Sequence, residues 1–300
     1  MVEKTAILIV NWNLREDTLA CIRALFAAGV RDEHVVLVDN GSSDRSPEAV
    51  QTEFEDRVVQ IQSDRNLGLA GGINAGLPAA LRTGADWIFL LNNDTVVSED
   101  VFERLGAALQ DLPGVGIWGP RIVYDTAPER VWSLGDRRVL GTLLTRPISE
   151  SAMSSNGLPS SIPVDVVSGC AMLVHRQVFE RIGGFDNSFF LFAEEVDFCL
   201  RAGQAGIDLA VAPRAVVRHK VSLSTDRDRP LARFLRIRNQ IRVYRRYASG
   251  AGKPFYFVFT ALRTVKMASV DLVRGDSGLA APSFRGWAAG WFTRADRHNP

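Results

Sequence analysis

The sequence predicts an α/β fold, in which helices cover both faces of a mainly parallel β-sheet and a helical extension follows at the C-terminus. Four short apolar runs of strand length lie in the first third of the chain, at residues 6–10, 35–39, 58–62 and 87–91. Segments with helical periodicity separate these runs. Strands that alternate with helices are typical of a parallel sheet buried on both faces. A chain of 300 residues, 46% hydrophobic and 23% charged, has the composition of a folded globular protein.

Helices are expected between and after these strands. Leu19, Ile22 and Leu25 recur at helical spacing. Ser46-Pro47-Glu48 is typical of a helix start with Ser46 as the N-cap, and residues 98–100 open another helix in the same way. Further along, the pattern predicts strands at 171–175, 209–212 and 216–218 and helices at 177–182, 194–205, 231–247, 254–272 and 284–292. Residues 149–161, rich in Ser, Pro, Gly and Asn, predict a loop, either at the surface or as a flap over a site.

Polar, turn-forming residues follow each of the first four predicted strands. These segments are NWN at 11–13, DNGSSD at 39–44, DRNLGLAGG at 64–72 and NND at 92–94. Each segment alone has a simpler interpretation, because Asn, Asp and Gly are also the commonest turn residues. Ligands of open parallel sheets, however, bind at the carboxyl ends of the strands. Four such segments in succession therefore predict one binding edge.

Composition and charge narrow the protein class. No apolar run has the length of a signal-peptide core or a bilayer span. Cys21, Cys170 and Cys199 lack CxxC spacing, which predicts reduced core residues of a cytoplasmic protein. The formal charge is +1, yet the segment from Arg227 to Arg274 holds twelve Lys and Arg residues against two Asp. Such a basic segment on an acidic body favours anionic partners.

Several motifs, taken in order, resemble one family. Beside the four segments above, the chain has GGINAG at 71–76, SGCA at 168–171, GGFD at 183–186, FFLF at 189–192 and EEVD at 194–197. Over roughly residues 5–225 the order and spacing resemble the family 2 glycosyltransferases of GT-A fold, especially the bacterial rhamnosyltransferase-like branch. The resemblance implies a GT-A catalytic domain over 1–226, with a nucleotide-binding half to about 115 and an acceptor half from about 116. A basic, aromatic helical extension would occupy 227–300.

The resemblance also implies a nucleotide-diphospho-sugar donor, either a dTDP or a UDP sugar. The expected donor-binding residues are Asn11, Asn13, Asp39, Arg65, Asn66, Gly68, Asn92 and Asn93. By resemblance, Asp39 accepts a hydrogen bond from N3–H of a pyrimidine; alternatively, it caps its own turn with Ser42 or Ser43. Arg65 is suited to a phosphate, although a surface ion pair explains it equally well. The glycines after the third strand let backbone approach the ligand, and the helix they open has an N-terminus that favours anions.

A divalent cation, Mn²⁺ or Mg²⁺, would neutralise the diphosphate as it leaves. Asp94 at a strand end is the expected ligand. The family's Asp-x-Asp is Asn92-Asn93-Asp94 here, and an amide is a weaker metal ligand than a carboxylate. By resemblance, His219 completes the metal site; the alternative is a histidine packed at a strand end. Lys220 is expected either to assist the diphosphate or to face solvent.

An inverting transferase needs a base that takes the proton of the acceptor hydroxyl, and Glu195 is the expected base. The family's Glu-Asp-x-Asp is Glu194-Glu195-Val196-Asp197 here, and a helix N-terminus keeps a carboxylate ionised. The alternative is an acidic first turn that merely stabilises the helix. Glu194 and Gly169 are expected on the acceptor side. Asp197 with Arg201 is expected to be a structural i,i+4 pair.

The expected reaction is the inverting transfer of a sugar, best assigned as L-rhamnose from dTDP-rhamnose, to a glycan or lipid-linked saccharide of a cell-surface polysaccharide. The basic, aromatic extension favours packing plus peripheral contact with an anionic membrane, at its cytosolic face. Packing alone and an oligomer interface are the alternatives, and no nucleic-acid module is present. One rival function is an inactive nucleotide-sugar-binding scaffold, motivated by the departures at Asn92 and Glu195. A nucleotidyltransferase would need an early Gly-rich loop with a lysine, which does not follow the first strand.

Overall fold

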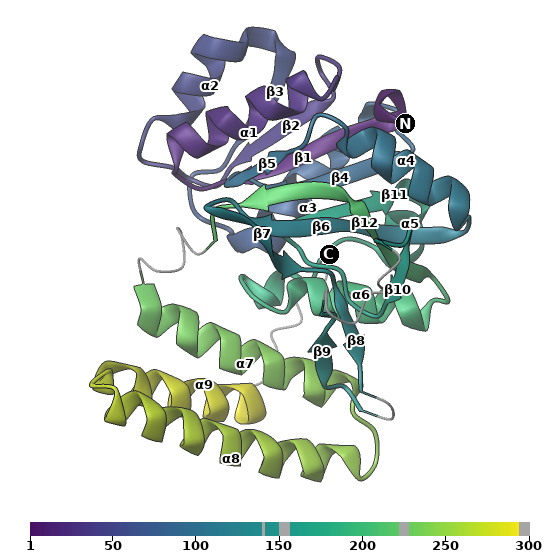
Figure 1. Ribbon diagram of the computed structural model, residues 1–300. Coiled ribbons are helices and arrows are strands. Elements are labelled where there is room, and N and C mark those ends of the chain that lie inside the picture. Colours follow the sequence, from purple (N-terminus) through teal and green to yellow (C-terminus); the bar gives the residue numbers. More distant parts are fainter. Residues whose placement is uncertain (140–141, 150–156, 222–227, 294–300) are drawn as a thin grey trace.

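A ten-stranded sheet forms the centre of the computed structural model, which describes residues 1–139, 142–149, 157–221 and 228–293 (Figure 1). Its strands follow the order β10-β12-β6-β11-β4-β1-β2-β3, and β5 and β7 pair with β12 and β6. The first four expected strands are confirmed as β1 (Thr5–Asn11), β2 (Val35–Asp39), β3 (Val58–Gln62) and β4 (Trp87–Asn92). They pair in parallel in the order β4-β1-β2-β3. The sheet with its helices is the predicted GT-A arrangement.

The second half of the sheet is mixed rather than parallel. Its strands are β5 (Thr95–Val97), β6 (Val115–Tyr124), β7 (Ala127–Ser133), β10 (Ile162–Val164), β11 (Ala171–His175) and β12 (Asp208–His219). Strand β11 runs antiparallel to both β4 and β6, while β12 runs parallel to β6. The two short strands expected at 209–212 and 216–218 are one strand, β12, whose register shifts between Ala212 and Val216.

Strand β6 was not expected, because the pattern after residue 115 is irregular. It contains Gly116, Gly119 and Pro120, and such residues inside a run argue against a strand when only the sequence is considered. Pro120 is tolerated where the paired β12 has its irregularity, between Ala212 and Val216. The exposed hairpin of β8 (Asp136–Arg138) and β9 (Thr145–Pro147) likewise carries no apolar pattern.

Helices cover both faces of the sheet. The helices packed on the sheet are α1 (Arg15–Ala27), α2 (Ser46–Phe54), α3 (Gly68–Arg82), α4 (Val101–Asp111), α5 (Arg176–Ile182) and α6 (Glu194–Gln204). Short 3₁₀ turns occupy Val2–Lys4, Glu55–Arg57, Asn187–Phe189 and Ser277–Leu279. The expected N-cap at Ser46 is wrong, because Arg45 with φ 62° precedes the helix and Ser46 is its first residue. The Ser46 hydroxyl instead donates to the Asp44 carboxylate. Helix α4 starts after Asp100, within three residues of the expected start.

The alternating side chains of β1 build two cores. Ile7 and Ile9 face the side covered by α1 and α4, and Leu8 and Val10 face the side covered by α3 and α6. Gly76 lets α3 approach the sheet, since a Cβ there would lie 2.3 Å from Leu8 Cδ1. The three cysteines, all within the described residues, are buried and form no disulfide, as expected. Packing on both faces of the sheet thus fixes the position of the strand ends at one edge.

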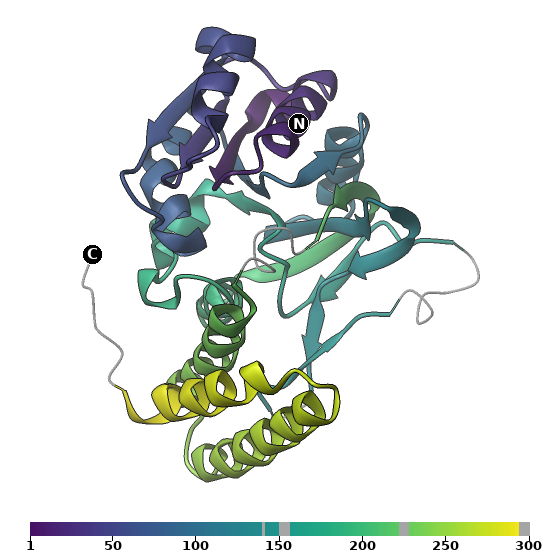
Figure 2. The same ribbon diagram turned by 90° about the vertical axis from the view of Figure 1, so that its left-hand side faces the viewer.

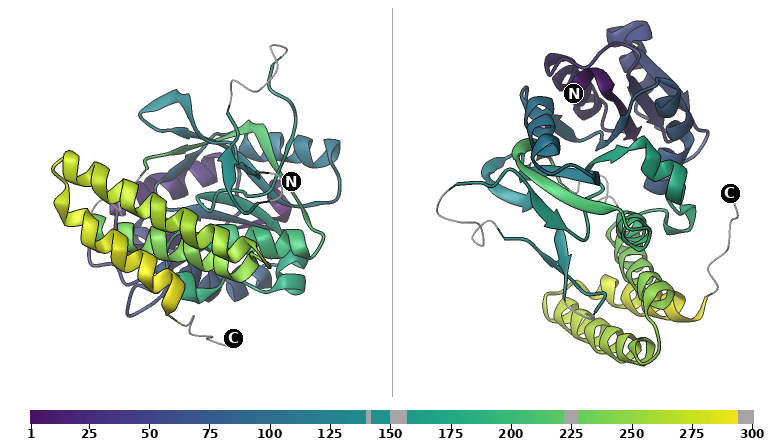
Figure 3. Two further views of the ribbon diagram at one scale, coloured as in Figure 1. Left: turned by 90° about the horizontal axis from the view of Figure 1, so that it is seen from below. Right: turned by 90° about the vertical axis from the view of Figure 1, so that its right-hand side faces the viewer.

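Three further helices lie below the sheet (Figures 1 and 2). They are α7 (Arg229–Tyr247), α8 (Gly252–Val273) and α9 (Ala280–Phe292). Figure 3 shows α8 and α9 as the outermost layer, with α7 between them and the rest of the protein. Gly286 and Gly290 of α9 pack against α7 near Phe234 and Ile241. Within the described residues, no helix combines the length and the apolar character that crossing a bilayer requires. The expected domain boundary at 226/227 and most of the expected loop at 149–161 fall outside the described residues.

Candidate active site at the carboxyl edge of the sheet

Asn11, at the end of β1, is the hub of a buried hydrogen-bond network. Its amide nitrogen donates to Asp39 Oδ1 (2.7 Å) and to Ser46 Oγ (2.8 Å). Its carbonyl oxygen accepts from the Thr18 hydroxyl (2.7 Å) and from Asn93 Nδ2 (2.9 Å). Asn11 is fully buried, and both ends of its amide have partners. Three of the four predicted strand-end segments, those after β1, β2 and β4, therefore meet in this network. Asn40 joins the segment after β3 to the same edge.

Asp39 and Asn13 complete this network. Asp39 Oδ2 accepts from the backbone N–H of Ser42 at 3.0 Å, which is the turn-capping alternative. Asn13 has φ 61°, and its side chain accepts from the backbone N–H of Ser43 at 2.9 Å. Asn11, Asn13, Asp39 and Arg65 do not line the cavity described below, within the described residues. Their expected contacts with the donor remain predictions.

The start of α3 lies against the loop that leads into α6. Gly68 has φ 76°, and a Cβ at this position would lie 2.2 Å from the carbonyl oxygen of Phe190. Asn66 caps the turn by accepting from Gly68 N–H at 2.8 Å. Asn40 Nδ2 donates to the Gly68 carbonyl oxygen at 2.9 Å. Glycine is thus required here by both its φ and the close approach of another backbone segment.

Asp94 and His219 meet across the sheet although 125 positions separate them. Thr95 of β5 pairs with His219 at the end of β12, which brings Asp94 Oδ1 to 3.3 Å from His219 Nε2. Trp132 packs edge-on against the imidazole, with ring centroids 4.8 Å apart. Both residues are about 6% exposed. Asp94 Oδ1 and His219 Nδ1 make no hydrogen bond within the described residues. Two buried groups, each with a polar atom that makes no hydrogen bond to the described residues, are thus available for a ligand.

Lys220, next to His219, neither reaches into the cavity nor simply faces solvent. Its ammonium forms an ion pair with Asp17 of α1. The hydrogen bond to that carboxylate raises the pKa of Lys220 above its ordinary value. This pair ties the end of β12 to α1.

Glu194 and Glu195 are the first two residues of α6. Both line the cavity that Asp94 and His219 also line. Burial raises the pKa of the Glu194 carboxyl well above its ordinary value, and the neighbouring Glu195 adds to this effect. Burial also raises the pKa of Glu195, and the charge of Asp136 raises it further. Glu194 Oε2 makes no hydrogen bond within the described part of the chain. A carboxylate whose pKa lies above its usual range is a stronger base.

A cavity of about 650 Å³ joins these elements. Its lining includes the predicted site residues Asn66, Gly68, Asn92, Asn93, Asp94, Gly169, Glu194, Glu195 and His219. A neighbouring cavity of about 580 Å³ is lined by Arg130, Asp136 and Ile148, among others. Trp132, Ser168 and Glu195 line both cavities. Asp94 and Glu195 therefore line the same cavity. Glu195 lies where this cavity meets the neighbouring one.

Some lining residues were not singled out from the sequence. They are Trp12, Asn40, Trp132 and residues of α7, among them Leu231, Ala232 and Leu235. Trp12 and Asn40 lie inside motifs that were recognised. The recognised FFLF segment at 189–192 also lines the cavity, through its last three residues. Trp132 lies on β7. The sequence of β7 has no recognisable strand pattern, because none of its residues is buried.

Helix α7 holds the loop that precedes Glu194. The fully buried Asn239 donates its amide hydrogens to the carbonyl oxygens of Phe189 (2.6 Å), Leu191 (2.8 Å) and Phe192 (3.0 Å). Phe190, Phe192 and Ala193 all have φ between 59° and 69°. Such left-handed conformations are costly for non-glycine residues and persist only where surrounding contacts impose them. Asn239 supplies such contacts.

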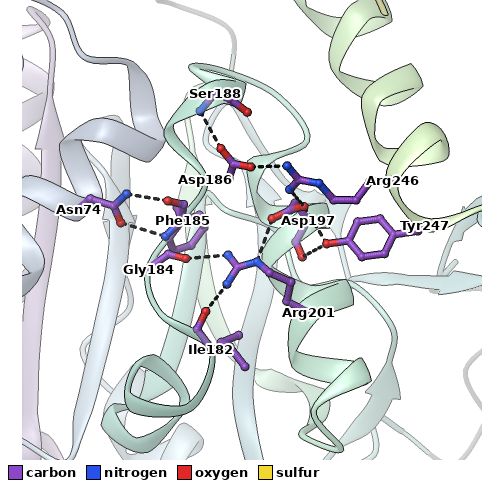
Figure 4. A network of polar contacts seen from close by, with 10 residues as sticks. All are labelled: Asn74, Ile182, Gly184, Phe185, Asp186, Ser188, Asp197, Arg201, Arg246 and Tyr247. Carbon is purple, nitrogen blue, oxygen red and sulfur yellow. Dashed lines mark hydrogen bonds and ion pairs between the residues drawn. The ribbon is translucent and has the colours of Figure 1, made fainter. Parts of the chain in front are cut away.

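A second set of contacts ties α7 to α6 (Figure 4). Buried Asp197 accepts from Arg201 (3.0 Å), Arg246 (2.6 Å) and the Tyr247 hydroxyl (2.8 Å). Arg246 also donates to Asp186 at 2.6 Å. The expected structural pair of Asp197 and Arg201 is confirmed. Its links to α7 were not expected, because nothing in the sequence relates residues fifty positions apart.

Comparison with known proteins agrees with this geometry. Residues 6–183 match the family model described as glycosyl transferase family 2. An N-acetylglucosaminyl-diphospho-decaprenol L-rhamnosyltransferase of Mycobacterium tuberculosis is 30% identical over 224 residues, which cover 69% of this chain and 73% of that protein. A dTDP-rhamnosyl transferase of Shigella flexneri is 23% identical, and the match covers 71% of each chain.

Solved structures show the same fold. A mannosyltransferase of Pyrobaculum calidifontis in complex with GDP-Man and Mn²⁺ superimposes with a TM-score of 0.56 at 14% sequence identity. The match covers 97% of this chain and 88% of that one. The chain is therefore a glycosyltransferase of GT-A fold that belongs to the rhamnosyltransferase-like branch of glycosyl transferase family 2.

Proposed function

We propose that the protein catalyses the inverting transfer of a sugar from a dTDP or UDP sugar to the hydroxyl of a lipid-linked saccharide, with L-rhamnose from dTDP-rhamnose as the best assignment. The observation that carries this proposal is that Asp94 and Glu195, about a hundred positions apart, line one cavity. The names of the two bacterial relatives support rhamnose as the sugar. The decaprenol-linked acceptor named for the mycobacterial relative supports a lipid-linked acceptor here.

The metal proposal rests on Asp94 and His219. Asp94 Oδ1 is buried without a hydrogen bond to the described residues and lies 3.3 Å from His219 Nε2. One carboxylate and one imidazole suit Mn²⁺, and Mg²⁺ less readily. Within the described residues no third His, Cys, Asp or Glu joins this pair, so oxygens of the donor diphosphate would complete the coordination. A bound cation would neutralise the charge of the departing diphosphate.

Glu195 is the proposed base. Its position between two cavities supports donor binding on the Asp94 side and acceptor binding on the side of Arg130 and Asp136. Its raised pKa makes the carboxylate a better acceptor for the proton of the attacking hydroxyl. Glu194 and Gly169, beside Glu195, are proposed to contact the acceptor. A Cβ on Gly169 would lie 3.3 Å from Glu195 Cβ, so a side chain there would crowd the base.

The remaining donor contacts follow the rim. Asn66, Gly68, Asn92 and Asn93 line the cavity and are proposed to contact the nucleotide or its diphosphate directly. Asn11, Asn13, Asp39 and Arg65 lie around the same edge and are proposed to complete the donor site. The cytoplasmic location expected from the cysteines likewise remains a proposal.

The test compares Glu195→Gln with the wild-type enzyme, with dTDP-rhamnose, Mn²⁺ and an N-acetylglucosaminyl diphospholipid acceptor. We expect transfer to fall by about 10²–10⁴-fold, the usual contribution of a general base, while donor affinity stays within about twofold. Glu103→Gln is the matched control, because Glu103 is also a first-turn glutamate but is exposed on α4. Undiminished turnover in Glu195→Gln would refute the assignment. A wild-type protein that binds the donor but neither transfers the sugar nor hydrolyses the donor would favour the scaffold alternative.

A further inference from the structure

Helix α8 has two faces of different character. Its buried residues Tyr256, Thr260, Thr264, Ala268 and Asp271 recur every three or four positions and face α7 and α9. The opposite face is apolar and exposed, and it consists of Phe255 (50% exposed), Val258 (56%), Leu262 (67%), Val265 (51%), Leu272 (58%) and Val273 (89%). We call these six residues the outer stripe. Several large apolar side chains exposed on one helix face are typical of an interaction site.

The outer stripe is distinct from the aromatic residues that build the three-helix unit. Tyr244 of α7 and Tyr256 stack with ring centroids 4.4 Å apart. Phe257 packs against Trp287 and Trp291 of α9 at 5.1 and 5.3 Å. These contacts join the aromatic side of α8 to α7 and α9. In the outer stripe, Phe255 contacts only rings of its own helix, Tyr256 and Phe259, among the ring contacts of the described residues. Figure 3 shows α8 at the outer surface of the molecule.

The exposed charges around the outer stripe have one sign. Lys253, Arg263 and Lys266 lie on α8, and Arg274 follows it; all four are exposed. The acidic residue of α8, Asp271, is turned inward, where it accepts from Arg233 at 2.6 Å. Helix α9 has one charged residue, the exposed Arg285. Arg263 and Lys266, next to Leu262 and Val265 of the stripe, give it a basic flank. Such a surface is complementary to a partner that carries both apolar and anionic groups.

We propose that the outer stripe of α8 docks onto the surface of an anionic lipid bilayer. A helix of 22 residues is about 33 Å long, and a helix with an exposed apolar face flanked by basic residues lies in the interface plane rather than crossing it. Basic residues beside the apolar face are attracted to anionic headgroups. A second copy of the chain fits less well, because a symmetric pairing of this stripe would bring like charges together.

The position of the stripe also bears on the active site, a step that rests on the proposed function. The hairpin β8–β9 lines the second cavity with Asp136 and Pro147. Its turn reaches α8, where the backbone N–H of Leu143 donates to the Tyr256 hydroxyl at 2.6 Å. Leu143 and Leu144 pack onto the cluster of Tyr244 and Tyr256. One hairpin therefore connects the membrane-facing helix to the cavity beside Glu195, so a lipid-borne acceptor would meet that cavity from the bilayer side.

The experiment is vesicle flotation with the full chain, without donor or acceptor. Vesicles contain phosphatidylcholine alone or phosphatidylcholine with about 30 mol% phosphatidylglycerol, whose anionic headgroups give the surface the negative potential that attracts basic residues. We expect binding to the anionic vesicles only, weakened by added salt, and a loss of about tenfold or more in the double variant Leu262→Glu/Val265→Glu. Val59→Glu, at an exposed apolar position on β3, is the matched control and should bind like the wild type.

Equal binding of the double variant and the wild type, or equal binding to both vesicle types, would overturn the proposal. So would a wild-type dimer in sedimentation that the double variant abolishes, since the stripe would then join two copies. Thermal unfolding of both variants verifies that they fold. Transfer to a water-soluble acceptor separates the two proposals: the double variant should keep wild-type turnover there, whereas failure of the proposed function would remove turnover and leave flotation unchanged.

Discussion

The polar residues at the ends of β1 and β2 have their hydrogen bonds satisfied within the protein, whereas some of those at the ends of β4 and β12 and the start of α6 do not, within the described part of the chain. On the first side, Asn11 uses both ends of its amide, and Asp39 uses both carboxylate oxygens. On the second side, Asp94, His219 and Glu194 each have a buried polar atom without a hydrogen bond to the described residues. Burial of a polar group without a partner is costly. The satisfied residues therefore shape the edge, while the unsatisfied ones are poised to bind a ligand.

The largest effect should come from the unsatisfied side. Asp94→Asn is expected to reduce Mn²⁺-dependent transfer by about 100-fold or more, because an amide cannot neutralise a cation that would bind the diphosphate. Stability should not fall, since the change removes the charge of a buried carboxylate whose Oδ1 makes no hydrogen bond to the described residues. The measurement is the transfer rate as a function of Mn²⁺ concentration, together with thermal unfolding. Asp86→Asn, just before β4 at the opposite edge of the sheet, is the control. Unaltered Mn²⁺ dependence in Asp94→Asn would remove the metal assignment.

The next effect concerns the loop between the two sides. Asn239→Ala is expected to lower kcat by up to about 100-fold, because misplacing Glu195 by an ångström is enough for a loss of that size. The KM for the donor should change far less, since Asn239 holds the loop 189–192 and does not line the cavity. Gln240→Ala, at the neighbouring position of α7, is the control. A variant with normal kcat but reduced stability would show that Asn239 has only a structural role.

Substitutions among the hydrogen-bonded residues at the ends of β1 and β2 should lower the stability of the protein more than its kcat. Asn11→Ala leaves the buried Asp39, Thr18 and Asn93 side chains each short of a partner, which costs about 1–3 kcal/mol per group left unsatisfied. We expect a lower free energy of unfolding in urea and a kcat within about threefold of the wild type at a temperature where the variant is folded. Loss of the donor contact proposed for Asn11 would appear in the KM for the donor. The comparison fails if kcat drops as far in Asn11→Ala as in Asn239→Ala while the unfolding free energy is unchanged.

The smallest effect is a shift in pH dependence. After burial, the charge of Asp136 raises the pKa of Glu195, and Glu194 is the other carboxyl beside it. The base must be ionised to act, so activity is lost as the pH falls through this pKa. Asp136→Asn removes one negative charge and should lower the pKa, which moves the acidic limb of kcat/KM to lower pH. The pH profile measures this, and a limb that moves to higher pH or stays in place would contradict the proposed facing of Asp136 and Glu195.

Local sequence patterns were enough for the first half of the fold. The apolar runs of β1 to β4 and the polar segments after them identified the edge because both signals lie within a few consecutive residues. The same approach missed β6, whose Gly116, Gly119 and Pro120 interrupt the pattern. It also could not give the antiparallel direction of β11, since strand direction depends on which neighbours the strand meets.

Contacts between residues far apart in the chain could not be predicted from local sequence patterns. The pairing of Asp94 with His219 was expected only through the family resemblance, and the 3.3 Å contact depends on the pairing of β5 with β12. Asn239 carries no signal in a helix dominated by arginines, although it donates to three carbonyl groups of the loop 189–192. The outer stripe of α8 became visible only once packing had covered the other apolar residues of the same helix.

The sequence by itself determined the α/β class, the family and the edge at which its motifs gather, because periodicity and turn chemistry are local properties of the chain. Only the tertiary structure decided which polar groups at that edge are satisfied and which are open, where Glu195 stands between two cavities, and which face of α8 remains exposed. These properties depend on partners supplied by distant segments, and a residue's burial and hydrogen bonds exist only after those segments have packed together.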